Sequence, residues 1–228
     1  MATLLLRLAG PLQSWGVECK FETRRTMNYP TKSGVIGLIA SAMGYSREQS
    51  VEDLSLLKFG VRIDRQGELL CDYHTAVSKK DIYVTKRYYL SDAIFLVGLE
   101  SDSVEFLHTI EYALKNPVYP LFLGRRSCPP TMPLVLGVRD NNLIDSLKEE
   151  KWLLENWRRK RIFDSNEKKL RIIIDNDDLN TMSVIKDVPI SFSPIHRKFL
   201  WRSVKDMGYI SKYNELQSTK HDPMKELR

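Results

Sequence analysis

The side chains of residues 3–9 alternate between two faces, with Leu4, Leu6 and Leu8 on one of them. This period of two predicts a strand that ends at Gly10. Further on, apolar runs with helical spacing alternate with short extended runs and turn residues. The elements expected up to residue 140 are a strand at 3–9, a helix from about 31 to 43, a short helical stretch at 50–57, a hairpin of strands 59–64 and 68–75, strand character over 88–99, a helix at 101–115 and a strand at 132–138.

This order of strand, helix, hairpin, helix and strand predicts an α+β fold of the ferredoxin-like βαββαβ type, which RNA-recognition (RRM) modules share. The pattern loosens after Arg139. A charged stretch with two tryptophans at 148–161 is expected as a helix or turn, and strands are expected at 170–174 and 192–204. Residues 1–140 are therefore predicted as one domain. Residues 141–228 are predicted as a small, mostly antiparallel β domain or an elaboration of the first.

The composition describes a globular protein with a basic surface. Hydrophobic residues make up 43% of the 228 residues, and the formal net charge is +6. Such a surplus permits RNA or DNA binding without establishing it. The three cysteines are far apart, which argues against a disulfide framework or a zinc site. We find no signal peptide and no run long enough to cross a bilayer, so the expected location is the cytoplasm.

Three segments join glycine or proline to basic residues at the ends of apolar runs: RLAGPLQSWG at 7–16, PTKSGVIGLI at 30–39 and LGRRSCPP at 123–130. A rigid scaffold presents backbone N–H groups and cations to a polyanion in this way. Together the segments favour nucleic-acid binding over small-molecule catalysis. Trp15 is a candidate for base stacking, although a large aromatic residue near a glycine turn also fits a place in the core.

The second segment places Lys32 at the start of the expected helix. The helix is capped by Thr31 or Ser33, and Gly34 and Gly37 keep one side of it bare. Free N–H groups, the helix dipole and a lysine predict an anion site that a sugar-phosphate backbone approaches closely. The same two glycines equally fit tight packing of the helix on the sheet, and the sequence leaves both interpretations open.

The third segment carries Arg125 and Arg126 between Gly124, which permits a sharp turn, and two prolines. Adjacent guanidinium groups on a stiff loop suit phosphate contacts, although an exposed pair or an internal ion pair also fits. A further basic stretch, KKDIYVTKR, interleaves Lys79, Lys80, Lys86 and Arg87 with Tyr83. It predicts a hairpin finger that touches RNA by charge and stacking, or else a solvated loop.

The sequence contains few candidate catalytic residues. The only compact cluster is Asp72-Tyr73-His74, in which the carboxylate and the imidazole share one face of a strand. Such a pair is usually structural. There is no P-loop, no metal motif and no RNP1 signature, so no cofactor, no metal and no stacking of bases on an open sheet are expected.

Several segments, in this order, resemble the signature segments of the CasD family: RLAGPLQSWG, RRTMNYPTKSGVIGLIASAMG, FGVRIDR, DYHTA, RYYLSDAIFLVGLE and LGRRSCPP. That family is the single-copy RAMP subunit of the type I-E CRISPR Cascade complex, which takes part in antiviral DNA targeting. The resemblance covers residues 3–138 most strongly.

The resemblance implies a ferredoxin-like body with a protruding β-hairpin thumb, here about residues 77–87. It implies a non-catalytic subunit that binds the 5′ handle of CRISPR RNA (crRNA) beside the Cascade backbone RAMP subunits and the Cascade large subunit. The handle-gripping segments of the family correspond to Lys32, Ser33 and Gly34 and to Arg125, Arg126 and Ser127, and the first segment adds Arg7, Gln13 and Trp15.

A second hypothesis is a metal-independent endoribonuclease that processes CRISPR repeat RNA, as the related subunit of type I-C systems does. It would need a general base and a cation beside the scissile phosphate. Tyr73, His74 and Lys32 are the available candidates.

Overall fold

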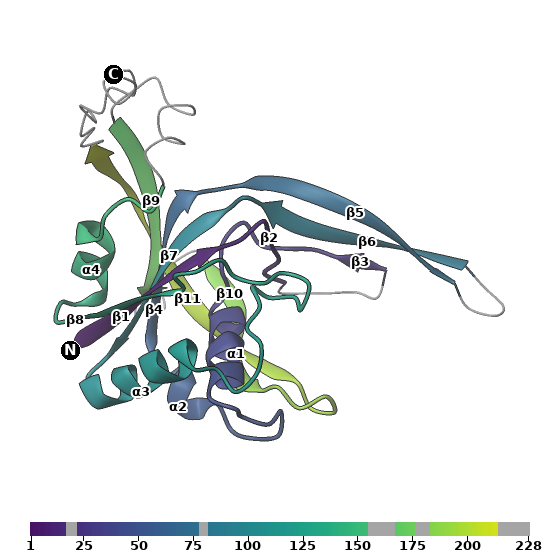
Figure 1. The fold of residues 1–228 in the computed structure, drawn as a ribbon, viewed down its shortest axis with the longest axis horizontal. Helices are drawn as coiled ribbons and strands as arrows, with labels where there is room; N and C mark the ends of the chain where they lie inside the picture. The colour runs from purple at the N-terminus through teal and green to yellow at the C-terminus, as the bar shows by residue number, and fades with distance from the viewer. Residues whose placement is uncertain (17–21, 78–81, 155–166, 177–182, 214–228) are drawn as a thin grey trace, which may run out of the picture.

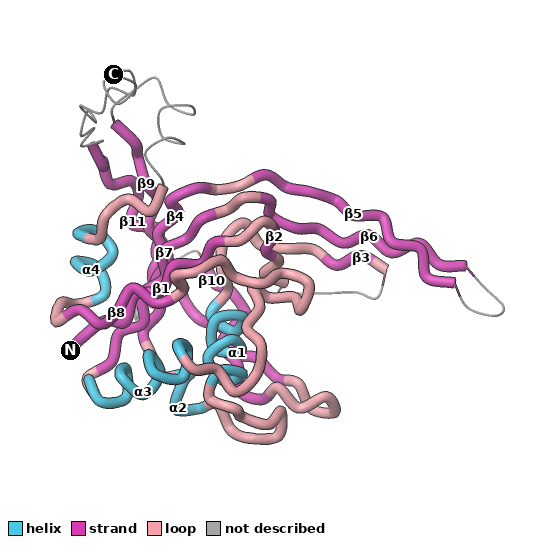
Figure 2. Tube along the Cα trace, in the orientation of Figure 1, coloured by secondary structure: helices cyan, strands magenta, loops and turns pink. Residues whose placement is uncertain are grey.

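The computed structural model describes residues 1–16, 22–77, 82–154, 167–176 and 183–213. Helices are few and strands dominate, as Figure 2 shows. The elements are β1 (Ala2–Ala9), β2 (Leu12–Gln13), β3 (Thr23–Arg24), α1 (Lys32–Ala42), α2 (Glu52–Ser55), β4 (Lys58–Arg65), β5 (Glu68–Val77), β6 (Ile82–Ser91), β7 (Ile94–Ser101), α3 (Val104–Lys115), β8 (Val135–Arg139), α4 (Leu143–Glu149), β9 (Glu167–Asn176), β10 (Val184–Ser191) and β11 (Lys198–Tyr213).

The body of the molecule is a 7-stranded sheet in the order β10-β11-β9-β4-β7-β1-β8. Every pair in it is antiparallel. In β1, Leu4, Leu6 and Leu8 belong to the large core cluster, whereas Leu5 belongs to a second cluster on the opposite face. The alternation predicted for this strand is therefore confirmed, and both faces of β1 are buried.

Helices cover both faces of the sheet (Figure 1). Buried residues of α1 and α3 share the large core cluster with Leu4 and Val97. The apolar side of α4, with Leu143 and Leu147, packs against Leu5 on the other face. Of the two residues predicted to cap α1, Thr31 is the cap, because its hydroxyl accepts a hydrogen bond from the Gly34 N–H.

The hairpin predicted for residues 59–75 is wrong. β4 stays in the main sheet between β7 and β9, whereas β5 pairs along its whole length with β6. The reason lies in the side chains, because β4 is almost entirely buried while none of the described side chains of β5 is buried. A strand with no buried face cannot join the core sheet, so the chain turns away at Gly67.

Gly67 makes this departure possible. Its φ is +73°, and a Cβ there would lie 2.5 Å from the carbonyl oxygen of Ser91. The β5–β6 hairpin then projects well beyond the body (Figure 1), with β2 and β3 paired to its near end. The expected thumb at 77–87 is only the outer part of a hairpin that spans residues 68–91.

The C-terminal strands continue the main sheet, because β9 pairs with β4 and β11 pairs with β9. The strand expected at 192–204 is present only from residue 198 onward, in β11, because residues 192–197 form the turn of the β10–β11 hairpin. Part of the helix or turn expected at 148–161 lies outside the described residues. The predicted division at residue 140 stays a prediction, although one sheet runs across it.

A buried ion pair joins the main sheet to the end of α4. The side chains of Arg62 and Asp64 are both 0% exposed and lie 2.7 Å apart. Arg62 also donates to the carbonyl oxygens of Leu147, Glu150 and Lys151. The guanidinium therefore satisfies carbonyl groups that the end of a helix leaves free. No local pattern predicts this contact, since its two ends are more than 80 residues apart.

Candidate nucleic-acid interface

The loop at 123–130 is held rigidly against the first segment of the chain. Gly124 has a φ of +83°, and a Cβ there would lie only 1.8 Å from the carbonyl oxygen of Ser14. Hydrogen bonds from the N–H of Leu123 to the oxygen of Cys128, and from the N–H of Cys128 to the oxygen of Arg125, close the loop. The sharp turn predicted at Gly124 is confirmed, and only glycine fits there.

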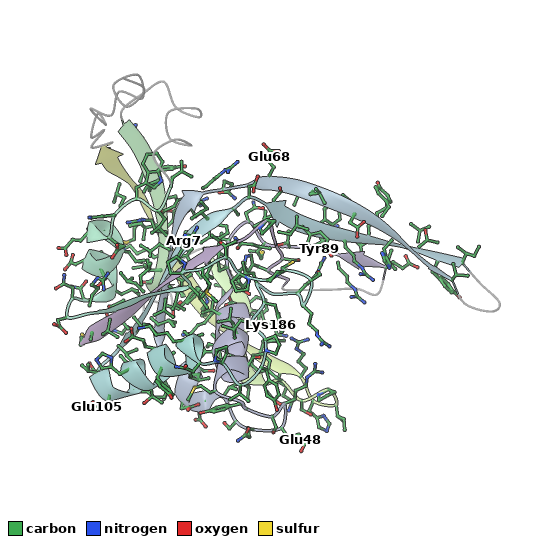
Figure 3. The ribbon with its side chains drawn as sticks, viewed as in Figure 1. Arg7, Glu48, Glu68, Tyr89, Glu105 and Lys186 are labelled. Atoms are coloured by element: carbon green, nitrogen blue, oxygen red, sulfur yellow. The ribbon has the colours of Figure 1, made fainter. Side chains whose placement is uncertain are left out.

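Arg125 lies in a fixed position on this loop. Its guanidinium sits 4.6 Å from the centre of the ring of Tyr89, which is labelled in Figure 3, and donates to the carbonyl oxygen of Arg24 at 2.9 Å. Its Nη1 atom and the Nε atom of Arg87 are buried and have no hydrogen-bond partner among the described residues. Arg126 and Ser127 stand exposed beside it. This geometry leaves cationic donors free at the base of the hairpin.

Strand pairing brings further basic residues to the same place. β3 runs parallel to β6, with Thr23 opposite Lys86 and Arg24 opposite Arg87. The backbone N–H of Lys86 donates to the oxygen of Glu22. We call the resulting group the hairpin-base cluster, which consists of Arg24, Arg25, Lys86, Arg87, Arg125 and Arg126.

No ion pair joins the hairpin-base cluster to a carboxylate within the described part of the chain. Unpaired cations repel one another, and an anion that binds among them reduces this repulsion. Sequence reasoning did not single out Arg24 and Arg25. Two adjacent arginines in a long loop were the only sign of this role in the sequence. Their position in the interface depends on the pairing of β3 with β6, which is a tertiary contact.

The N-terminus of α1 does not present a free anion site. The backbone N–H of Lys32 donates to the Asp187 carboxylate at 2.8 Å, and its ammonium pairs with Asp175 at 2.9 Å. Arg202 bonds both carboxylates from the other side. Burial lowers the pKa of Arg202, but its hydrogen bonds to Asp187 and the two nearby carboxylates raise it overall. The charges of this cluster balance, so Lys32 is engaged inside the protein.

The two glycines of α1 differ in what surrounds them. A Cβ on Gly34 would lie 2.8 Å from the Trp15 ring, whereas a Cβ on Gly37 would lie 3.6 Å from the Phe192 ring. Close packing against Trp15 therefore explains why position 34 is a glycine, a question that the sequence alone did not decide. Ser33 is partly exposed in the first turn.

The residues expected from the first segment are mostly internal. Gln13 is 0% exposed and Trp15 is 1% exposed. The Gln13 amide donates to the oxygens of Leu8 and Ala93 and accepts from the Trp15 indole. Arg7 is partly exposed and donates to Thr131 and Met132 at 3.4 Å. A side chain without exposed surface cannot stack on a base, so Gln13 and Trp15 position the loops around them.

The hairpin carries the remaining expected residues. Lys79 and Lys80 lie outside the described residues. Lys86 is exposed, and its ammonium lies 5.5 Å from the centre of the exposed Tyr73 ring on the paired strand. A cation and an aromatic face thus stand together on β5 and β6.

Asp72 and His74 lie on β5 as expected, and no hydrogen bond between their side chains is present. Within the described ranges, no group of three or more histidine, cysteine or carboxylate side chains is placed to hold a metal ion. Burial raises the pKa of the Cys128 thiol, which disfavours a reactive thiolate there. None of the described helices is long and apolar enough to cross a membrane. The geometry favours binding of a polyanion.

Comparison with known proteins agrees with this geometry. The sequence pattern of a family described as CRISPR-associated protein (Cas_Cas5) matches residues 3–205. The chain belongs to the Cas5 family. The Cascade subunit CasD of the CRISPR system of Escherichia coli (strain K12) is 38% identical in an alignment over 156 residues that covers 59% of this Cas5 chain and 70% of that protein. The predicted membership of the CasD family is thereby confirmed.

Two solved structures resemble this Cas5 chain over nearly its full length. A chain of a CRISPR RNA-guided surveillance complex has a TM-score of 0.76 at 32% identity, with 92% of this chain and 91% of that one covered. A crystal structure of a Cas protein has a TM-score of 0.69 at 37% identity, with 90% and 94% covered. The likeness therefore includes the C-terminal strands, where sequence resemblance was weak.

Proposed function

We propose that this Cas5 chain is a non-catalytic subunit of a CRISPR surveillance complex of the Cascade type and holds the 5′ handle of the crRNA. The observation that carries the proposal is the hairpin-base cluster, in which β3, β6 and the 123–130 loop place unpaired cations side by side. A phosphate backbone is the ligand that such a surface fits best. The similarity to a chain of an RNA-guided surveillance complex supports the same conclusion.

The proposal assigns each part of the fold a role. The four strands β4, β7, β1 and β8, with α1 and α3 on one face, support a ferredoxin-like βαββαβ body. The β5–β6 hairpin is the thumb, and Lys86 on it extends the hairpin-base cluster outward. The partners are the Cascade backbone RAMP subunits and large subunit, and the location is the cytoplasm.

The proposed RNA contacts divide the expected residues into two groups. Arg87, Arg125, Arg126 and Ser127 contact the handle directly, together with Arg24 and Arg25. The other group acts from inside the protein: Gln13 and Trp15 support the loops, and Lys32 and Gly34 fix α1. Lys79 and Lys80 belong to the proposal as residues of the thumb.

Replacing Arg125 and Arg126 with alanine is expected to weaken handle binding and to lower its salt dependence. Each lost phosphate contact releases one fewer counterion, so the slope of log K against log salt should fall by about 1–2. Electrophoretic shift or fluorescence anisotropy with the repeat-derived handle at several salt concentrations measures both quantities.

The matched control removes the same charge elsewhere. Arg47 and Lys148 are exposed and lie outside the hairpin-base cluster. Their double alanine variant should retain most of the affinity and the slope. If both double variants lose affinity equally, net charge alone accounts for binding, and the assignment of the hairpin-base cluster fails.

The isolated protein is expected not to cleave repeat RNA, with or without divalent metal. Asp72 and His74 are not hydrogen-bonded to each other, and Lys32 is paired with Asp175. The candidate base and cation of the endoribonuclease hypothesis are thus separate. Gel analysis of end-labelled repeat RNA tests this: cleavage at one defined position, abolished by His74→Ala, would establish an enzyme instead.

A further inference from the structure

The β10–β11 hairpin presents a second basic surface that the proposed function does not use. Within residues 183–205 the exposed charged side chains are Lys186, Arg197, Lys198 and Lys205. The one carboxylate in this range, Asp187, is 1% exposed and bonded to the buried Arg202. Within residues 183–205 the outward charge is therefore entirely positive, and Asp206, the next residue of β11, is paired with Arg171.

An exposed tryptophan stands among these cations. Trp201 is 63% exposed, and its neighbours Leu200 and Val184 are 54% and 50% exposed. Trp201 lies directly opposite Lys186 across the two strands, and the Lys186 ammonium is 5.8 Å from the ring centre. A large aromatic ring left in water beside lysines is a feature that solubility or packing alone does not explain.

The strand geometry places these groups on one face. Trp201 and Lys205 are four residues apart in a regular part of β11, so they point the same way with a spacing of about 13 Å. Arg202, between them, points to the opposite face and is buried. Lys205 pairs with Ile174, which belongs to the buried cluster on the α4 side of the sheet. Trp201 and Lys205 therefore lie on the α4 side of the sheet, and both side chains are exposed there.

The other face of the hairpin is anchored in the body. The Ser55 hydroxyl at the end of α2 donates to the oxygen of Pro189, and the Phe192 ring lies close to Gly37 of α1. At the tip, the Arg197 guanidinium lies 5.5 Å and 6.0 Å from the ring centres of Phe199 and Phe192. The cationic face is therefore presented by a fixed ribbon and not by a loose tail.

We infer that the Lys186–Trp201–Lys205 face is a second binding site for single-stranded nucleic acid. The lysines contact successive phosphates, and the indole stacks on an unpaired base. A duplex would not expose a base face to Trp201, so the site discriminates against double strands. None of these side chains reads a sugar or a base edge in this arrangement, so DNA and RNA strands should bind alike.

The test uses the full-length chain carrying Arg125→Ala and Arg126→Ala, which removes the proposed handle contacts. The probes are fluorescein-labelled oligo(dT) and oligo(U) of ten nucleotides, and a ten-base-pair duplex. Indole fluorescence of the protein that also carries Trp157→Phe provides an independent readout, since of the other three tryptophans Trp15 and Trp152 are buried and Trp201 is exposed. Circular dichroism and thermal melting confirm that each variant is folded.

In that background, both single strands should bind and quench the indole fluorescence, and the duplex should bind more weakly. Trp201→Ala should weaken single-strand binding about 5- to 100-fold and remove most of the quenching. Trp201→Phe should restore much of the affinity. The double variant Lys186→Gln and Lys205→Gln should lower the salt slope by about 1–2.

The control removes two charges elsewhere, at Arg47 and Lys148, both of which are exposed. Single-strand binding by the Trp201→Ala protein that is as tight as in its parent, equal effects of the two double variants, or duplex binding as tight as single-strand binding would each overturn the inference. If the face instead docks a protein, the single strands will not quench Trp201. Handle binding by the protein with Arg125 and Arg126 intact tests the proposed function separately, because none of the second-site residues belongs to the hairpin-base cluster.

Discussion

Replacing Arg62 with methionine is expected to lower the free energy of unfolding by about 3–5 kcal/mol. The substitution leaves the Asp64 carboxylate without its cation at a position that is 0% exposed. It also strips the carbonyl oxygens of Leu147, Glu150 and Lys151 of their donor. In a chain of this size the loss corresponds to a fall in melting temperature of about 10 °C, which calorimetry or urea unfolding measures.

Two further variants separate the charge from the geometry. Arg62→Lys keeps the charge, but an ammonium cannot serve Asp64 and three carbonyl oxygens as the guanidinium fork does, so most of the loss should remain. Arg62→Met combined with Asp64→Leu removes both charges and should recover part of the stability. A single variant that melts within about 2 °C of the natural protein would show that the end of α4 rearranges without cost.

Replacing Gly34 with valine is expected to destabilise the protein by about 1–3 kcal/mol, the cost of overpacking a close contact. The new Cβ would lie 2.8 Å from the Trp15 ring and 3.0 Å from the Thr31 hydroxyl that caps α1. Trp15 has no space into which to move, since it is 1% exposed and hydrogen-bonded to Gln13. We therefore expect Gly34→Val to reduce the stability of the protein more than it reduces binding of a phosphate group. The interpretation of Gly34 as part of an anion site predicts the opposite.

Gly37 provides the matched control on the same helix. A Cβ at this position would make an ordinary contact of 3.6 Å with Phe192. Gly37→Ala should therefore stabilise the protein by about 0.5–1 kcal/mol, the usual gain in a helix interior. Melting and handle binding are measured on the same samples. A Gly34→Val protein that melts normally but no longer binds the handle would restore the phosphate site at α1.

The sequence alone determined much of this protein through local signals. Alternation identified β1 and the two faces on which Leu4 and Leu5 lie, a capping residue identified the start of α1, and apolar residues at helical spacing identified α3. Glycine and proline punctuation identified the rigid loop that carries Arg125 and Arg126. The ordered segments identified the family. Such features depend on neighbours along the chain, which is why periodicity and turn chemistry suffice to find them.

The tertiary structure decided what the local signals left open. β5 has no buried face among its described side chains, and it therefore pairs with β6 and not with β4, the strand that precedes it in the sequence. Lys32 was predicted as a free cation, but its ammonium pairs with Asp175 and its backbone N–H donates to Asp187. Both carboxylates are more than 140 residues away in the sequence. Arg24 and Arg25 joined the interface only because β3 pairs with β6. Charges meet their partners through packing of distant segments, and their availability to a ligand therefore depends on the complete fold.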